Sequence, residues 1–206
     1  MDFSRSVFIN CPFDEDYWDL FRPLVFTILR LGCQPRYSLE RADSSEARIG
    51  KITALIKECR FGIHDLSRCV AKKKGEMFRL NMPLELGLDM GAKAYGTGRL
   101  KTKRILILEE ERYRFQAAVS DIANSDIKAH GGDPDQVVRA VRDWLVQEAG
   151  VNPMSPTAIW YEFNDCLAEI HDNLGSEGYS DNDIKAFPEH ELIQRMIKWV
   201  ASGPRK

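Results

Sequence analysis

The chain has 206 residues, 44% of them apolar, so it is long enough for one substantial core and too short for two large domains. Its 31 acidic and 29 basic side chains leave a formal charge of −2, which excludes a global field that collects nucleic acid or anionic lipid. No apolar run approaches the roughly 18 residues that cross a membrane. We expect a cytoplasmic protein, because the five cysteines are odd in number, lack close pairing and suit a reducing compartment.

The first strand and helix are expected close to the N-terminus. Residues 6–11 form a short apolar run closed by Pro12, which predicts a buried strand that ends at a turn. Apolar residues then recur at intervals of three and four, from a cap at Asp14 to Gly32, which predicts a helix. Pro23 lies inside this pattern and should bend the helix.

A second strand, helix and strand follow. The second strand is expected over residues 33–39, where Pro35 argues against a central position in the sheet. Ser44 or Ser45 is the expected cap of the next helix. The third strand is expected over residues 60–65.

A polar loop over residues 66–78 leads into the stretch around which the chain is organised, residues 79–93. Pro83 suits a first helical position, which would make Asn81 or Met82 the cap and place Glu85 in the first turn. Leu84, Leu88 and Tyr95 fall on one stripe at roughly helical spacing. Gly87 and Gly91 would let this helix approach the sheet closely.

The remaining strands and helices are expected in the second half of the chain. Residues 104–108 are an unbroken aliphatic run that suits a strand buried on both faces, and residues 126–130 suit a short fifth strand. Amphipathic helices are expected over residues 133–149, 155–173 and 181–200.

The alternation of strands and helices predicts an α/β fold. We expect a flavodoxin-like doubly wound parallel sheet of about five strands in the order 2-1-3-4-5, with a C-terminal helical extension. The expected organisation is an α/β domain over residues 1–150 and the extension over residues 151–206. This order places the topological switch point between the first and third strands, where residues 10–13 and 64–67 meet and ligands are expected to bind.

Three segments in this order carry a family resemblance: residues 7–14 (VFINCPFD), residues 63–67 (IHDLS) and residues 81–93 (NMPLELGLDMGAK). Together they resemble the nucleoside 2-deoxyribosyltransferase-like and Toll/interleukin-receptor (TIR)-like superfamily, over residues 1–110. The sequence departs from familiar members in having no Trp-Cys pair before the glutamate. Its first turn is Asn-Cys-Pro-Phe rather than the Ser-Tyr type of many TIR domains.

The resemblance implies an activity and a set of site residues. Glu85 would attack or stabilise the anomeric carbon of a sugar, and Asp65 would contact the sugar. The implied reaction cleaves the N-glycosidic bond of NAD or a related nucleotide or nucleoside, as an antiviral defence effector. The nucleotide is then a substrate rather than a cofactor, and the expected macromolecular partners are further copies of the chain or a protein of a defence system. The expected substrate-binding residues are Asn10, Pro12, Phe13, Arg36, Ser67, Asn81 and Met82.

One carboxylate suffices for this chemistry. Cleavage develops oxocarbenium character at the sugar, which a carboxylate beneath the anomeric carbon captures covalently or stabilises. Nicotinamide already leaves from a cationic pyridinium and needs no strong general acid, whereas a neutral purine needs a proton donor.

Each candidate residue also has a purely structural interpretation. Glu85 would cap a helix, and Asp65 would form an Asx-type turn with Ser67. Phe13 would be a core aromatic residue. Asn10 would only satisfy backbone groups of its loop. Most of Arg36, Glu40, Asp43 and Arg48 would form a solvated cluster of salt bridges.

Other site classes find no support in the sequence. His64 and His130 stand near strand ends without the expected partners of a Ser-His-Asp or Cys-His site, and no metal-ligand spacing occurs. Neither a dinucleotide-binding glycine motif nor a P-loop is present, and the basic residues 72–74 and 99–104 are typical of solvated loops. The alternative function is a non-enzymatic TIR-like module that binds a nucleotide signal or assembles through its faces and C-terminal helices.

Overall fold

A computed structural model describes residues 2–68, 71, 74, 80–117, 119–122 and 125–203. Cys69, two of the three lysines at 72–74 and most of the loop expected before the Glu85 helix lie outside the described residues. Within the described ranges, no helix combines the length and apolarity that a membrane crossing requires.

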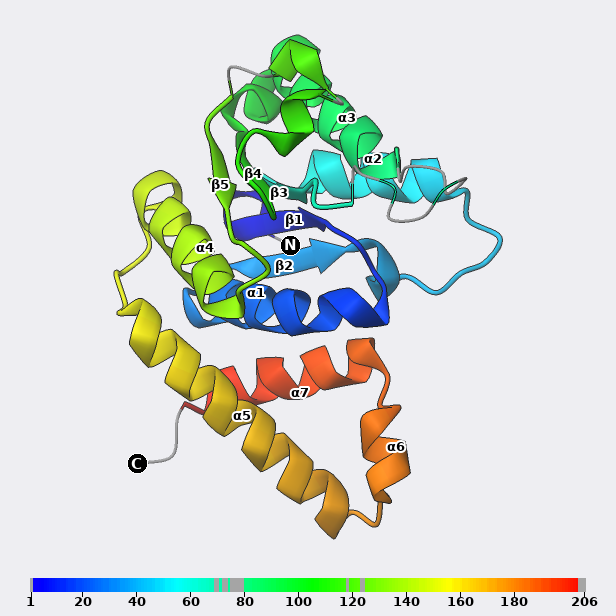
Figure 1. Cartoon of the computed structure of the whole chain (residues 1–206), viewed down its shortest axis with the longest axis vertical. Helices are drawn as coiled ribbons and strands as arrows, with labels where there is room; N and C mark the ends of the chain where they lie inside the picture. The colour runs from blue at the N-terminus through cyan, green and yellow to red at the C-terminus, as the bar shows by residue number, and fades with distance from the viewer. Residues whose placement is uncertain are drawn as a thin grey trace.

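A parallel five-stranded sheet forms the centre of the molecule and has the order β2-β1-β3-β4-β5 (Figure 1). This order confirms the predicted flavodoxin-like fold class. Asn10 at the end of β1 pairs in register with His64 of β3, which places the two expected strand ends side by side. The short strand β2, which contains Pro35, lies at one edge of the sheet. The strands are β1 Ser6–Asn10, β2 Gln34–Tyr37, β3 Phe61–Asp65, β4 Arg104–Glu109 and β5 Ile127–Ala129.

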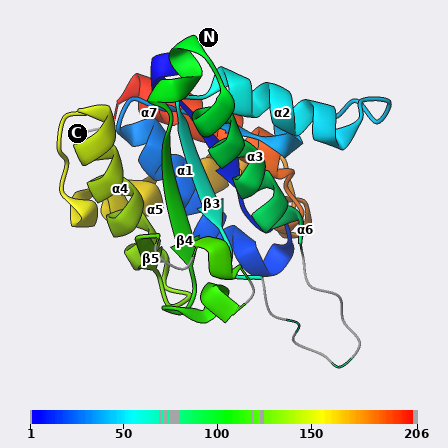
Figure 2. The same cartoon turned by 90° about the horizontal axis from the view of Figure 1, so that it is seen from above.

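Helices cover both faces of the sheet (Figures 1 and 2). Helices α1 (Trp18–Arg30) and α4 (Pro134–Ala149) pack on one face. Helices α2 (Arg48–Glu58) and α3 (Asn81–Tyr95) pack on the other. The expected caps of three helices are wrong, because α2 follows Ala47, α3 follows Leu80, and α1 begins only after a 3-10 turn, Glu15–Tyr17.

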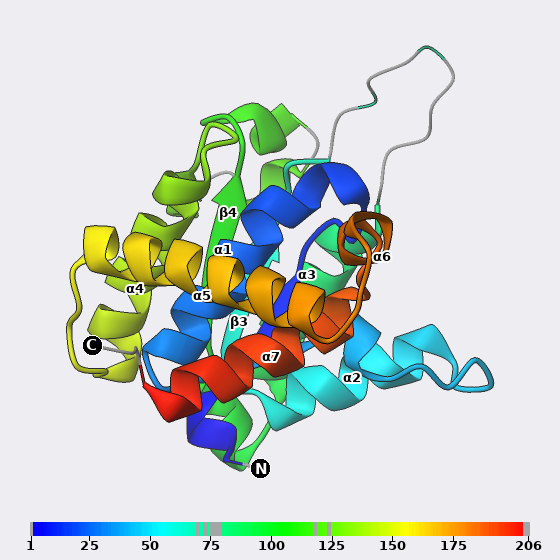
Figure 3. The same cartoon turned by 90° about the horizontal axis from the view of Figure 1, so that it is seen from below.

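Three C-terminal helices form a further layer outside α1 and α4 (Figure 3). They are α5 (Pro156–Ser176), α6 (Asp181–Lys185) and α7 (Glu189–Ser202), so the helix expected over residues 181–200 is divided in two. The ring of Phe26 in α1 lies 5.6 Å from that of Phe163 in α5 and 5.8 Å from that of Trp199 in α7. The extension therefore shares one hydrophobic core with the α/β unit.

Helix α3 turns a different face to the sheet from the one predicted. Leu84 is 55% exposed and Tyr95 is 89% exposed, so these two residues of the predicted stripe face outward, while Leu88 is partly buried. Gly87 does not approach the sheet either, because a Cβ atom there would meet no atom within 4 Å. The buried residues of α3 are Met82, Glu85, Leu86 and Asp89.

Gly62 of β3 explains how a carboxylate can face the sheet. A Cβ atom at Gly62 would lie 2.1 Å from Asp89 Oδ2 and 3.0 Å from His64 Nε2. The missing side chain therefore provides the space in which Asp89 and His64 meet. A polar contact, rather than an apolar stripe, sets the rotation of α3 about its axis.

We predict that Gly62→Ala lowers the free energy of unfolding by about 1–3 kcal/mol, because the added methyl group displaces the buried Asp89 carboxylate. Urea denaturation of the two proteins measures this difference.

The control is Gly87→Ala in α3, where the methyl group meets open space. This variant should be stabilised by ~0.5–1 kcal/mol, because alanine is the better helix former. Equal stability of the two variants would contradict the assigned role of Gly62.

Candidate functional site

Glu85 lies at the carboxyl edge of the sheet, on the inner face of α3. The helix begins at Asn81, so Pro83 does not occupy its first position and Glu85 falls in the second turn. The first turn of α3 contains no acidic residue. The capping interpretation of Glu85 is therefore wrong, and its burial needs another reason.

Glu85 is a buried acid with a long ion pair. The residue is 5% exposed, and among the described residues its ion-pair partner is Arg48 of α2, whose Nη2 lies 3.9 Å from Oε1. Burial raises the pKa of Glu85 from 4.5 to about 7, although the Arg48 guanidinium acts in the opposite direction. A carboxyl group with this pKa populates both protonation states near neutral pH, as a reacting group requires.

Asn10 joins the end of β1 to the start of α3. Its side-chain nitrogen donates to the Met82 carbonyl oxygen and to His64 Nδ1, both at 2.9 Å. The Met82 carbonyl fixes the orientation of this amide, because only the nitrogen side can donate to it. Both amide hydrogens are thus used within the protein, and Asn10 holds α3 against the sheet.

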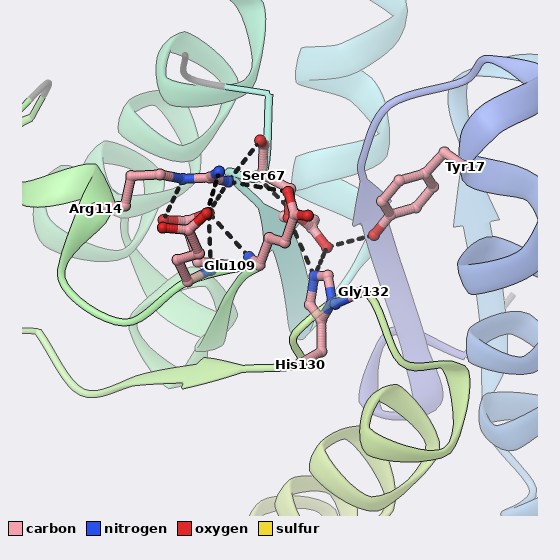
Figure 4. A network of polar contacts seen from close by, with 9 residues as sticks. Tyr17, Ser67, Glu109, Arg114, His130 and Gly132 are labelled. Atoms are coloured by element: carbon pink, nitrogen blue, oxygen red, sulfur yellow. Dashed lines mark hydrogen bonds and ion pairs between the residues drawn. The ribbon is translucent and has the colours of Figure 1, made fainter. Parts of the chain in front are cut away.

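Asp65 is the centre of a second polar cluster, at the carboxyl ends of β3 and β5 (Figure 4). Its carboxylate accepts hydrogen bonds from the Tyr17 hydroxyl, from the Ser67 hydroxyl and, at 2.8 Å, from the Ser67 backbone N–H. A fourth contact, at 3.0 Å, comes from His130 Nε2. The Asx-type turn between Asp65 and Ser67 is therefore present.

His130 meets both residues of a Ser-His-Asp set, contrary to the sequence expectation, but not in a catalytic arrangement. Its Nε2 lies 3.1 Å from Ser67 Oγ and 3.0 Å from Asp65 Oδ2. The Gly132 N–H donates to Nδ1 at 3.0 Å, so Nδ1 is unprotonated and Nε2 carries the hydrogen. A protonated Nε2 cannot take a proton from Ser67, because a triad uses one ring nitrogen for each partner.

Two glycines make the His130 contact possible. Gly131 has φ 61° and Gly132 has φ 73°, a left-handed conformation that residues with a side chain rarely adopt. This turn follows β5 directly and directs the Gly132 N–H back to the imidazole ring (Figure 4).

The two carboxyl groups have opposite environments. Asp65 is fully buried, which alone would raise its pKa, but the hydrogen bonds that it accepts from His130, Ser67 and Tyr17 hold the pKa below its usual range. Asp65 therefore remains ionised while Glu85 titrates near neutral pH, and such a separation is typical of sites that assign different roles to two acids.

Cys11 lies near both carboxyl groups. Burial raises the pKa of its thiol well above the usual value, and the charges of Asp65 and Glu85 raise it further. The two predicted catalytic positions thus flank the turn that follows β1.

The other expected binding residues have structural contacts. Arg36 pairs with Glu40 at 2.7 Å and Glu58 at 2.9 Å, so a salt bridge is present, but Arg36 is buried rather than solvated. Phe13 is half-buried and packs edge-on against Phe21, with 5.4 Å between the ring centroids. The remaining three are Pro12, which is buried, Asn81, which is exposed, and Met82, whose side chain packs with Leu66 and Leu86.

Arg114 fixes the ends of β3 and β4 beside this cluster. Its guanidinium pairs with Glu109 at 2.5 Å and donates to the Ser67 carbonyl oxygen at 2.8 Å (Figure 4). A cavity of about 240 Å³ opens next to Ser67 and His130. Glu85 is not among the residues that line this cavity; they are Asp16, Tyr17, Asp19, Leu20, Ser67, Arg68, Glu110, His130 and Gly132.

The described part of the chain contains no group of three or more His, Cys, Asp or Glu side chains placed to hold a metal ion. Comparison of the chain with protein-family models, with curated proteins and with solved structures found no match.

Three residues at these sites were not predicted from the sequence to be site residues. Arg48 was expected in a solvated cluster, Tyr17 on the apolar side of a helix, and His130 without a partner. The position of His130 directly after a strand and before two glycines was the one usable signal. Tyr17 and Arg48 have no local signal, because their partners lie far away in sequence.

The raised pKa of Glu85 makes stability depend on pH. The folded state holds the Glu85 proton more tightly than the unfolded state does. The protonated Glu85 therefore contributes to the free energy of unfolding, in full below pH 4.5, and this contribution is lost as the pH rises through 7. In wild type, the free energy of unfolding should fall by up to ~1.4 kcal/mol per pH unit in this window, relative to Glu85→Gln. Urea denaturation from pH 4 to 8 measures the difference.

The control is Asp165→Asn, a change at an exposed position of α5. Its stability should follow that of wild type at every pH. A constant difference between wild type and Glu85→Gln across the range would contradict the raised pKa.

Proposed function

We propose that this protein is an N-glycosidase that cleaves the N-glycosidic bond of NAD or a related nucleotide or nucleoside, with Glu85 as the catalytic carboxylate. One observation carries the proposal: Glu85 is buried at the carboxyl edge of β1 and β3 with a pKa of about 7 and has no capping role. Open α/β sheets bind their ligands at this edge. The resemblance in the sequence supplies the reaction class.

The surroundings suit a carboxylate that faces a developing positive charge. In its ionised form Glu85 is poorly solvated, so an oxocarbenium centre beside it would be strongly stabilised or captured. Arg48 favours the ionised form without closing a short ion pair, since the two side chains are 3.9 Å apart. The carboxylate therefore remains available to a ligand.

Asp65 and Ser67, at the same edge of the sheet, are weaker candidates than Glu85 for the catalytic group. Asp65 is fully buried and accepts hydrogen bonds from Tyr17, Ser67 and His130, which supports a positioning role for it. Ser67 lacks a base, because the Nε2 of His130 carries a hydrogen. Glu85 is then the carboxyl group that can change its protonation state during a reaction.

A single carboxylate favours one kind of leaving group. Glu85 cannot serve at once as the ionised nucleophile and as the acid that protonates a departing base. Nicotinamide, which departs from a cationic pyridinium, needs no such acid, so we propose NAD as the first substrate to test.

We further propose a cytoplasmic location, supported by the free thiols of Cys11, Cys33, Cys59 and Cys166.

One observation favours the alternative of an assembly module. The outward face of α3 and the residue before it expose the large apolar side chains of Leu80, Leu84 and Tyr95. Such a face is typical of a contact surface for another protein.

The activity test uses the purified chain and its Glu85→Gln variant. Each protein is incubated with NAD and with a panel of nucleosides, deoxynucleosides and nucleotides, and the released base is quantified by chromatography. We expect release by wild type and a loss of roughly 100-fold or more in the variant, which cannot ionise at this position. Release that is equal in both proteins would contradict the assignment of Glu85, and the lack of any release would favour the assembly module.

The pH profile tests the protonation state that acts. If the ionised carboxylate is the reacting form, kcat/KM rises with pH and levels above about 7, the pKa of Glu85. Arg48→Met should move this midpoint to higher pH, because the guanidinium lowers the Glu85 pKa. Arg41→Met, which removes a guanidinium that pairs with Glu46 instead, should leave the midpoint in place. If the midpoint of the pH profile is the same in Arg48→Met and in wild type, Glu85 is excluded as the group that sets it.

A further inference from the structure

Four polar side chains form a continuous line through the interior beneath α3. Asn10 contacts His64 at 2.9 Å, His64 Nε2 lies 3.0 Å from Asp89 Oδ2, and Asp89 Oδ1 lies 3.0 Å from the Lys103 ammonium nitrogen. None of the four is more than 1% exposed. They come from β1, β3, α3 and the residue just before β4, so the line crosses from one element to the next.

Hydrogen-bond chemistry gives this line a direction. An ammonium group only donates, and besides its ion pair with Asp89 the Lys103 ammonium donates to the carbonyl oxygens of Ile56, at 2.8 Å, and Cys59. The paired Asp89 carboxylate accepts from His64 Nε2–H, which leaves Nδ1 of the same ring as an acceptor. That acceptor orients the Asn10 amide, whose other hydrogen reaches the Met82 carbonyl oxygen.

Stability alone is a poor explanation for such a line. Burying two charges has a desolvation penalty that a well-packed apolar pair would avoid. The buried Asp89 carboxylate also requires a glycine at position 62, because a side chain there would collide with it. The line ends on Met82, in the turn of α3 that precedes Glu85 and on the same buried face. Because each donor and acceptor in the line has a fixed role, the line would hold the first turn of α3 in one position relative to β1.

We propose that Asp89 and Lys103 are positioning residues for Glu85, acting through the tautomer of His64 and the orientation of Asn10. Their effect on the reaction rests on the proposed function, whereas their effect on the Glu85 carboxyl group does not. In the described part of the chain, the titratable groups that face Glu85 are Arg48 of α2 and the Cys11 thiol after β1, and both are unchanged in the variants below.

The test compares two double variants, Asp89→Asn/Lys103→Met and Asp89→Leu/Lys103→Met. Both lose the Lys103 ammonium and the Asp89 charge, so both lose the same ion pair. They differ in one respect, because the asparagine still accepts from His64 Nε2–H and the leucine does not. The Glu85 carboxyl shift, followed by ¹³C NMR over pH, and amide hydrogen exchange at Leu86 are measured in each.

We expect the asparagine variant to keep the wild-type midpoint of Glu85. In the leucine variant the midpoint should move by one pH unit or more, and exchange at Leu86 should become at least tenfold faster. A merely structural role would affect both variants alike, so equal midpoints in the two would overturn the proposal.

A measurement on the wild-type protein keeps the proposal testable if a variant fails to fold. The ¹⁵N shifts of the His64 ring should show a hydrogen on Nε2 and none on Nδ1. The opposite tautomer would overturn the proposal, because Nδ1 then could not accept from Asn10. Both readouts are independent of turnover, so a protein without N-glycosidase activity would refute the proposed function and leave this test intact.

Discussion

The structure depends on how two carboxylates are buried on the inner face of α3. Asp89 faces the Lys103 ammonium at 3.0 Å, where neither side chain is exposed, so its charge is compensated inside the protein. Glu85, one turn earlier, pairs among the described residues with the Arg48 guanidinium at 3.9 Å, and that Arg48 side chain is 58% exposed. The paired acid therefore fixes the helix, while the weakly paired acid has its pKa raised to about 7. One helix face thus supplies both the anchor and the group that can react.

The second polar cluster complements this division. Asp65 is ionised and held by donors from the 3-10 turn before α1, from Ser67 after β3 and from the turn after β5, and the neighbouring Arg114 adds the end of β4. These contacts draw three strand ends together at the carboxyl edge of the sheet. The same contacts occupy Asp65 and leave Glu85 as the carboxyl group able to meet a ligand, which is why the proposed N-glycosidase chemistry is assigned to Glu85.

Much of the fold follows from sequence patterns, whereas the rotation of α3 does not. The aliphatic run of β4, the edge position of Pro35 and the alternation of strands and helices were sufficient to predict the strand order, which is confirmed. The inward face of α3 was predicted wrongly, because the periodicity rule assumes that apolar side chains face the sheet. Here Gly62 makes room for Asp89, and Leu84 and Tyr95 face outward as a result. Contacts such as Tyr17 with Asp65 join residues remote in sequence, so no local pattern indicates them.

The central claim is that the fold holds Glu85 as a carboxyl group that titrates near neutral pH. The most direct measurement is the pH titration of its side-chain carboxyl ¹³C shift in the wild-type protein labelled at glutamate, with the signal assigned by its absence in Glu85→Gln. The account predicts a midpoint at about pH 7. A midpoint at the ordinary value of 4.5 would show a solvated surface acid and would contradict the account.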